Sequence, residues 1–185
     1  MRMRTKWFKN HGERTTDETS SALGFIFWQI SIDRLKSLRK ADIGVFSPQQ
    51  SIDILREISM FLIHNADRII HERFSAEERA ELLQKLAVHV ADNYAGNALD
   101  ALGSGDYKNE YISRLNERLS EYSAIIGSGE GLRFSLSRTL GAHAEAIVPE
   151  KDKPWVAQQL IEIEIPEVFD KFDRACGSLL LLGDG

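Results

Sequence analysis

Apolar residues recur along most of this chain at the three-to-four-residue spacing of an amphipathic helix. Between about 20 and 40 they cover most of a helix surface, and the polar strip is limited to Gln29, Asp33, Lys36 and Lys40. A helix that is apolar on nearly all sides belongs in the middle of a bundle or against a partner. The pattern therefore predicts a central first helix.

Two strong helix starts follow this segment. Ser47 is a good N-cap residue, and Pro48 suits the first helical position, where its missing N–H costs nothing. Ser75 and Glu78 have the capping-box spacing, in which each side chain accepts a hydrogen bond from an otherwise unpaired amide. Because only a short joint separates the two helices, we expect an antiparallel helical hairpin at about 48–102.

Short segments rich in glycine and serine occur at 103–106 and at 127–130. Neither segment has the spacing of a phosphate-binding loop or of a dinucleotide fingerprint, and neither follows a strand pattern. Each comes directly after an apolar helical ending, so glycine stops between helices are the better interpretation. A fourth helix is expected over about 106–126 and a fifth over about 130–148.

The C-terminal region has a mixed pattern. LIEIEI at 160–165 alternates as a strand does, while Ile161, Ile165, Phe169 and Phe172 share one helical face. We favour a sixth helix over about 154–176, kinked or broken at Pro166. The sequence thus predicts an all-α, single-domain bundle of five to six helices over 20–185, preceded by a flexible basic arm at 1–19.

Composition places the chain among ordinary folded domains. With 185 residues, 43% of them hydrophobic, it can bury one substantial core. Its single cysteine, Cys176, cannot form an internal disulfide, which agrees with a reducing cytoplasm. No stretch reaches the length of uninterrupted apolar residues that a membrane-spanning helix needs, so we expect no transmembrane segment.

The net charge of −5 argues against a general nucleic-acid-binding protein, since phosphate backbones attract dense positive charge. Residues 1–14 are the exception, with five basic side chains and one acidic. Trp7 and Phe8 are interleaved with them, as in segments that contact RNA, DNA or an anionic membrane surface. A basic terminus without a partner is the simpler interpretation of this arm.

The pattern His-x-x-Asp occurs twice, as HNAD at 64–67 and HVAD at 89–92. Helical bundles build metal sites from carboxylates and histidines at this spacing on facing helices. With one further histidine the candidate ligands are His64, Asp67, His71, His89 and Asp92. The metal or other cofactor, if one is bound, is not identified by the pattern.

The helical projection argues against an internal metal site. On both helices of the hairpin the apolar residues centre far from His64 and His89, so these side chains are expected to point outward. A solvated polar face is then the main interpretation, a subunit or partner interface the second, and a metal site beside that interface the third.

His143 shares a face with Leu136, Leu140 and Ile147, so it is the one histidine expected to point inward, as a hydrogen-bonded buried residue. No arrangement typical of nucleophilic catalysis is evident, which leaves an enzymatic activity undecided. We expect a protein–protein interaction or regulatory module acting as a homo-oligomer. The alternative is an enzyme or a metal- or ligand-binding bundle with a site between helices, built from His143 or from the His and Asp group.

Overall fold

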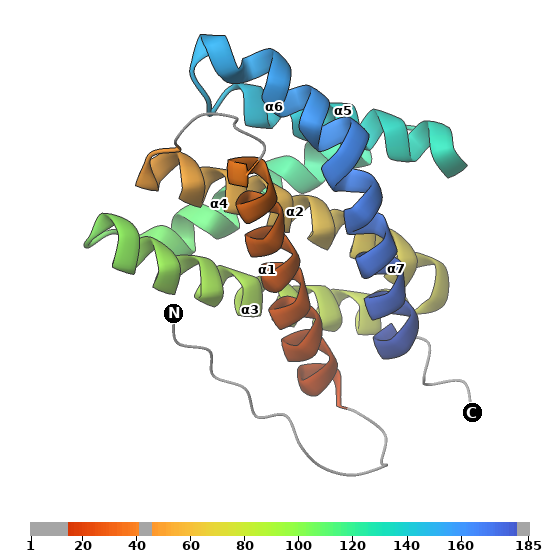
Figure 1. Cartoon of the computed structure of the whole chain (residues 1–185). Coiled ribbons are helices and arrows are strands. Elements are labelled where there is room, and N and C mark those ends of the chain that lie inside the picture. Colours follow the sequence, from red (N-terminus) through yellow and green to blue (C-terminus); the bar gives the residue numbers. More distant parts are fainter. Residues whose placement is uncertain (1–14, 41–45, 181–185) are drawn as a thin grey trace.

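The computed structural model describes residues 15–40 and 46–180, and this part of the chain is an all-α bundle without strands (Figure 1). Its α-helices are α1 (Thr16–Lys40), α2 (Pro48–Arg73), α3 (Ala76–Leu102), α4 (Tyr107–Ser123), α5 (Gly129–Glu145), α6 (Lys153–Gln159) and α7 (Ile165–Leu180). A 3₁₀ turn, Glu150–Asp152, precedes α6. The fold class predicted from the hydrophobic pattern is confirmed.

The hairpin of α2 and α3 begins and ends where the sequence signals place it. Ser47 caps α2 through a bond of 3.1 Å from the amide of Gln50, and Ser75 caps α3 through a bond of 3.3 Å from the amide of Glu78. Both starts are complete capping boxes. Arg79 then fastens the joint, because its Nε and Nη2 donate to the Asp67 carboxylate at 2.6 and 2.8 Å.

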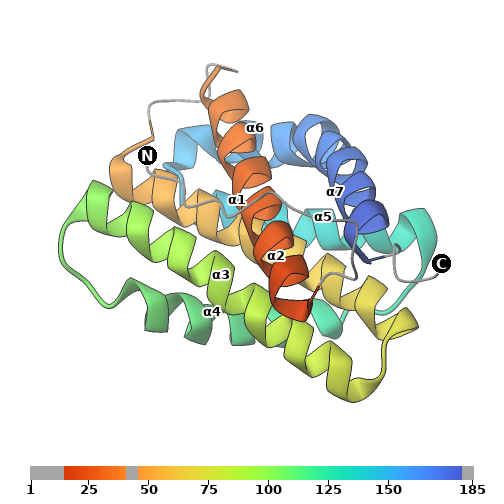
Figure 2. The same cartoon turned by 90° about the horizontal axis from the view of Figure 1, so that it is seen from below.

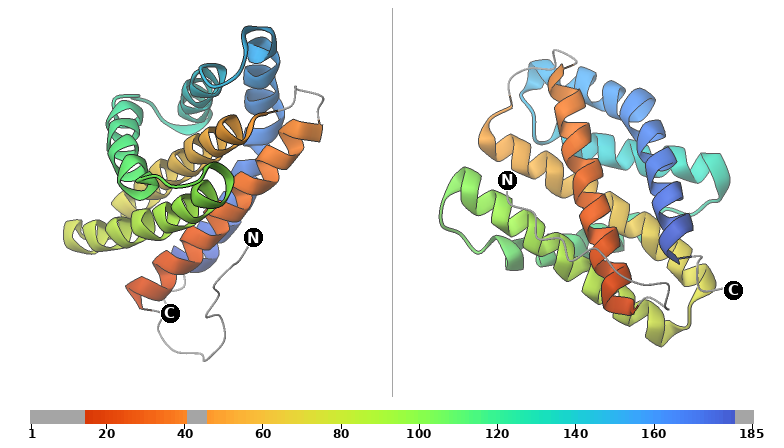
Figure 3. Two further views of the ribbon diagram at one scale, coloured as in Figure 1. Left: turned by 90° about the vertical axis from the view of Figure 1, so that its left-hand side faces the viewer. Right: turned by 60° about the horizontal axis from the view of Figure 1, so that its bottom comes forward.

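Helix α2 is the central element of the bundle. It contacts α1, α3, α4, α5 and α7, and nearly every residue from 51 to 66 is buried. The left panel of Figure 3 shows α2 between α1 on one side and the α4–α5 pair on the other. The central position expected for the first helix is therefore held mainly by the second.

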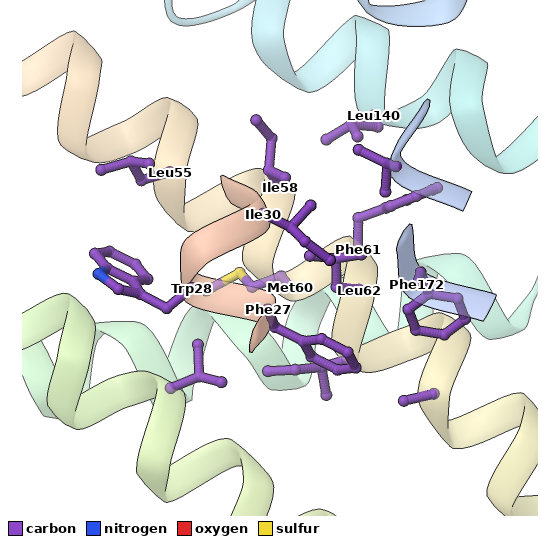
Figure 4. Packing of buried hydrophobic residues seen from close by; sticks show 14 of the residues in the cluster. Phe27, Trp28, Ile30, Leu55, Ile58, Met60, Phe61, Leu62, Leu140 and Phe172 are labelled. Carbon is purple, nitrogen blue, oxygen red and sulfur yellow. The ribbon is translucent and has the colours of Figure 1, made fainter. Parts of the chain in front are cut away.

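Helix α1 crosses the hairpin diagonally and packs on α2, α3 and α7 (Figure 2). Gly24 permits this close crossing, because a Cβ there would lie 2.9 Å from the Cβ of His89. Figure 4 shows Phe27 of α1 directed toward Phe172 of α7, with ring centroids 5.5 Å apart. Helix α1 begins at Thr16, so the expected arm is shorter than 1–19. Its remainder at 1–14 lies outside the described residues.

The C-terminal segment is helical throughout, and the strand-like alternation at 160–165 does not produce a strand. Leu160–Glu164 form a π-helical turn, in which the Ile165 amide donates to the Leu160 carbonyl five residues earlier. Pro166 explains this widening, because it has no N–H and its ring collides with the carbonyl four residues back in a regular α-helix. The expected kink at Pro166 is thus a π turn just before it.

Buried polar contacts attach this turn to α1. Arg34 donates to Glu164 at 2.9 Å, and Ser37 donates to the other carboxylate oxygen at 2.7 Å. Gln159 adds a bond of 3.0 Å to the same carboxylate, and Arg34 also contacts Glu167. Glu164 is therefore a fully buried carboxylate with each of its oxygens hydrogen-bonded.

None of the described helices combines the length and the apolar character that a membrane crossing requires.

Candidate functional site

Four of the five proposed metal ligands lie apart, and three of these four interact with other residues. Asp67 is held by Arg79 at the α2–α3 joint, and Asp92 pairs with Lys108 at 2.6 Å. His89 lies 3.6 Å from Asp17 of α1, and His71 is exposed near the end of α2. Among the described residues no group of three or more His, Cys, Asp or Glu side chains is placed to hold a metal ion.

His64, the fifth candidate, does not point outward as the projection predicts. Its exposed fraction is only 3%, and its ring stacks on Tyr122 of α4 with centroids 5.2 Å apart. The projection is wrong because it considers the hairpin alone, whereas α4 and α5 cover this face of α2. Burial is the main cause that lowers the pKa of His64 from 6.5 to about 4, with the charge of Arg68 adding to it.

His143 does point inward, but it is not the only histidine to do so and it is less buried than His64. Its side chain is 15% exposed, and the ring meets the edge of Tyr122 with centroids 6.2 Å apart. Nε2 lies 3.0 Å from a Glu121 carboxylate oxygen, at an angle that does not make a hydrogen bond. The two inward-facing histidines thus lie on either side of one tyrosine.

His143 also lines a polar cleft of about 530 Å³ between the start of α2, the middle of α4 and the end of α5. Its lining residues are Ser47, Gln49, Gln50, Asp53, Arg56, Glu57, Arg114, Arg118, His143, Ala146 and Ile147. Each helix contributes a polar face whose opposite face packs in the core. Three arginines and a histidine thus converge on this cleft.

Arg118 and Glu57 form the inner wall of the cleft. Glu57 is 2% exposed, and Arg118 donates to its two oxygens from Nε at 2.7 Å and from Nη2 at 3.3 Å. Burial opposes the charge of Arg118, but the hydrogen bond and the charge of Glu57 outweigh it and raise the pKa of the guanidinium. This two-bond pair fixes the plane of the guanidinium at the wall.

Arg56 and Arg114 complete the positive lining. Arg56 pairs with Asp53 at 2.8 Å, while its buried Nε has no hydrogen-bond acceptor among the described residues. Arg114 is half-exposed, and its carboxylate partner is Glu117 at 2.7 Å. Three guanidinium groups therefore face the lining carboxylates Asp53 and Glu57, while Glu117 and Glu121 pair with Arg114 and Arg118 at the edge of the cleft.

The N-terminus of α2 adds a positive partial charge beside these arginines. The cleft is lined by residues of the first turns of α2, and its first turn has no acidic side chain. A helix N-terminus corresponds to a positive partial charge, so it favours an anion nearby. Donor geometry and the helix dipole both suit an anionic group.

A comparison with protein-family models, with curated proteins and with solved structures finds no match to this chain. The site therefore has to be understood from its own residues. Sequence reasoning missed the three arginines. A signal was present in the i,i+4 spacing of Arg114 and Arg118 on a helix with one narrow apolar stripe, but their convergence with Arg56 depends on how α4 packs on α2.

Proposed function

We propose that this protein is a helical-bundle ligand-binding protein, and that its ligand is a small anionic molecule held in the α2–α4–α5 cleft. The convergence of Arg56, Arg114, Arg118 and His143 on one cleft of about 530 Å³ carries this proposal. Planar guanidinium groups match carboxylates and phosphates through paired N–H donors. The proposal follows the alternative function expected from the sequence, with arginines in place of the His and Asp group.

The arrangement also indicates which side chains would meet the ligand. A cleft of this volume can accommodate a small molecule. Arg114 is the half-exposed donor at the rim, whereas Arg118 is already ordered by Glu57 deeper in the cleft. A ligand with an anionic group and further polar atoms would use Arg114 and Arg56, with Gln49 and Gln50 beside them.

The test is calorimetric titration of the protein with inorganic phosphate, pyrophosphate and citrate at low ionic strength. We expect saturable binding of at least one of them, weakened about tenfold by Arg114→Gln, which removes one charge-assisted contact. Arg114→Gln leaves the core intact because its partner Glu117 is exposed. Arg174→Gln, an exposed arginine of α7 outside the cleft, is the matched control and should bind as the wild type does.

Absence of binding by all three anions, or an equal loss in the Arg114 and Arg174 variants, would overturn the proposal. The second outcome would show attraction by general surface charge, which salt screens strongly. A titration repeated at high salt separates these cases, since contacts inside a cleft are screened less than contacts at the surface.

A second function, an interaction or regulatory module acting as a homo-oligomer, is supported by a different observation. Large apolar side chains remain exposed on the described surface, with Ile126 at 97% and Trp155 at 64% exposure. Light scattering coupled to size exclusion tests self-association, and Trp155→Ser should shift the assembly toward the monomer. A protein that is monomeric at every concentration would remove the homo-oligomer from this proposal.

We also propose a cytoplasmic location, supported by the state of Cys176. The thiol is buried in α7, and burial is the main cause that raises its pKa to about 12. Such a thiol is inert, and a chain with one cysteine has no internal disulfide, which agrees with a reducing compartment. Fractionation of cells that make the protein tests this location, and recovery outside the cytoplasmic fraction would contradict it.

A further inference from the structure

The stack of His64 and Tyr122 joins α2 to α4 through buried polar groups that lack partners. Neither ring nitrogen of His64 has a hydrogen-bond partner among the described residues, and neither has the Tyr122 hydroxyl. Both side chains are at least 97% buried. Such groups normally occur hydrogen-bonded, and burying an unpaired charge costs far more than burying a neutral polar group, so this contact favours the neutral imidazole.

The surroundings of His64 would oppose a positive charge on its ring. On α2 itself, Asp67 and Arg68 lie about one turn after His64. Arg68 opposes a positive charge on the ring, and Asp67, which would favour one, is already paired with Arg79 of α3. From α4 the facing group is the Tyr122 hydroxyl. From α5 His143 lies against the edge of Tyr122, with Glu121 of α4 beside that second imidazole.

Toward α7 the contacts are aromatic, through Phe61 and Phe169, whose ring centroids lie 5.8 Å apart. Arg133 of α5 lies over the Phe169 ring and forms an ion pair with Asp173 at 3.1 Å. No unpaired carboxylate among these groups is placed to neutralise a charged His64. A proton on its ring would therefore have to be hydrated, and this requires α2 and α4 to separate locally.

A local separation of α2 and α4 at His64 would also change the anion cleft. His64 lies two turns after Glu57 on α2, and Tyr122 lies one turn after Arg118 on α4. The His64–Tyr122 stack and the Glu57–Arg118 pair are thus neighbouring contacts between the same two helices. Movement of α4 away from His64 would also displace Arg118 from its position in the wall.

From this geometry we infer that His64 is an acid-sensitive switch: its protonation opens the α2–α4 contact at Tyr122 and disassembles the cleft. The part of this inference that concerns regulation of ligand binding rests on the proposed anion-binding function. The opening of α4 itself does not depend on a ligand. Ligand would be held at neutral pH and released on acidification.

The experiment is hydrogen exchange of the full chain at pH 7 and pH 5, corrected for intrinsic exchange rates. At a pH between the ordinary histidine pKa of 6.5 and the folded pKa of about 4, His64 takes up one proton when the contact opens. Lowering the pH in this range therefore favours the open form. We expect the α4 amides around Tyr122 to open about twentyfold more often at pH 5 than at pH 7.

His64→Phe keeps a stacking ring that takes no proton, so it should abolish this increase. His71→Gln, an exposed histidine near the end of the same helix, is the matched control and should retain it. An unchanged acid response in His64→Phe overturns the inference. The inference is also overturned if His143→Gln loses the acid response while His64→Phe retains it, because protonation of His143 would then be the cause.

A measurement on the wild-type protein keeps the test decisive if His64→Phe does not fold. Nuclear magnetic resonance titration of the imidazole protons should give a pKa of His64 well below 6.5, and a value at or above 6.5 overturns the inference. Neither measurement contains a ligand, so a failure to bind anions counts against the cleft and not against the switch. Pyrophosphate titrations of the wild type and of His64→Phe at both pH values then link the switch to the cleft. The anion itself gains a proton on acidification, so the expected result is a smaller loss of affinity from pH 7 to pH 5 in His64→Phe than in the wild type.

Discussion

At the scale of single residues, several charged or polar side chains are buried in the bundle and have specific partners. His64, Glu57 and Glu164 are each at most 3% exposed. Glu57 and Glu164 have arginine partners, whereas His64 has an aromatic one. The sequence identified His64 as chemically interesting but not its environment, because the covering residue Tyr122 lies almost sixty positions further along the chain.

The stability of the protein should fall on acidification because of His64. The unfolded chain accepts a proton near pH 6.5, while burial lowers the pKa of the folded imidazole to about 4. This contribution is thus fully present above pH 6.5 and is lost as the pH falls toward 4, by about 2 kcal/mol at pH 5. Urea unfolding at pH 7 and 5 should show this loss in the wild type and a smaller one in His64→Phe, and parallel losses would contradict the assignment.

Two buried tyrosines of α4 should respond in opposite ways to removal of their hydroxyl groups. The Tyr111 hydroxyl exchanges a hydrogen bond of 2.8 Å with Ser59 of α2, whereas the Tyr122 hydroxyl has no partner among the described residues. Tyr111→Phe should lower the free energy of unfolding by about 1–2 kcal/mol, because it removes a buried hydrogen bond, although Ser59 still donates to the Arg56 carbonyl at 2.9 Å. Tyr122→Phe should leave it unchanged or raise it, and equal losses in chemical denaturation would refute this difference.

At the scale of elements, the capping boxes of α2 and α3 could be read directly from the sequence, because a cap depends on residues three positions apart. The π turn before Pro166 was not expected, although the same proline predicted a kink there. A missing amide can be accommodated by a bend or by a widened turn. Here the buried contact of Glu164 with Arg34 accompanies the widened turn.

The attachment of the C-terminal segment to α1 should depend on Arg34 far more than on Lys171. Arg34 and Glu164 are both buried, while Lys171 and Asp33 join the same region as a half-exposed pair at 3.4 Å. Arg34→Ala should destabilise the fold by about 3 kcal/mol because it leaves a buried carboxylate without its charge partner. Lys171→Ala should cost less than about 1 kcal/mol. Thermal unfolding monitored by circular dichroism distinguishes them, and similar losses would contradict a special role for the buried pair.

At the scale of the whole molecule, the all-α class and the hairpin could be predicted from periodicity and caps, since both are local properties. The site could not, because it depends on which faces of the hairpin other helices cover. The helical spacing of Tyr111, Leu115 and Tyr122 indicates one buried face of α4, but it does not indicate that this face lies on α2 beside His64. The cleft formed by the remaining polar faces is a consequence of that packing.

The proposal that this cleft binds a small anion is the central claim, and the arginine side chains report on it directly. Magnetic resonance signals of the Nε–H groups of Arg56, Arg114 and Arg118 can be followed while pyrophosphate is added to the wild-type protein at neutral pH. We predict that these three signals shift together and saturate with one dissociation constant, while the signal of Arg174 does not move. Shifts spread evenly over surface arginines, or none at all in the cleft, would contradict the claim.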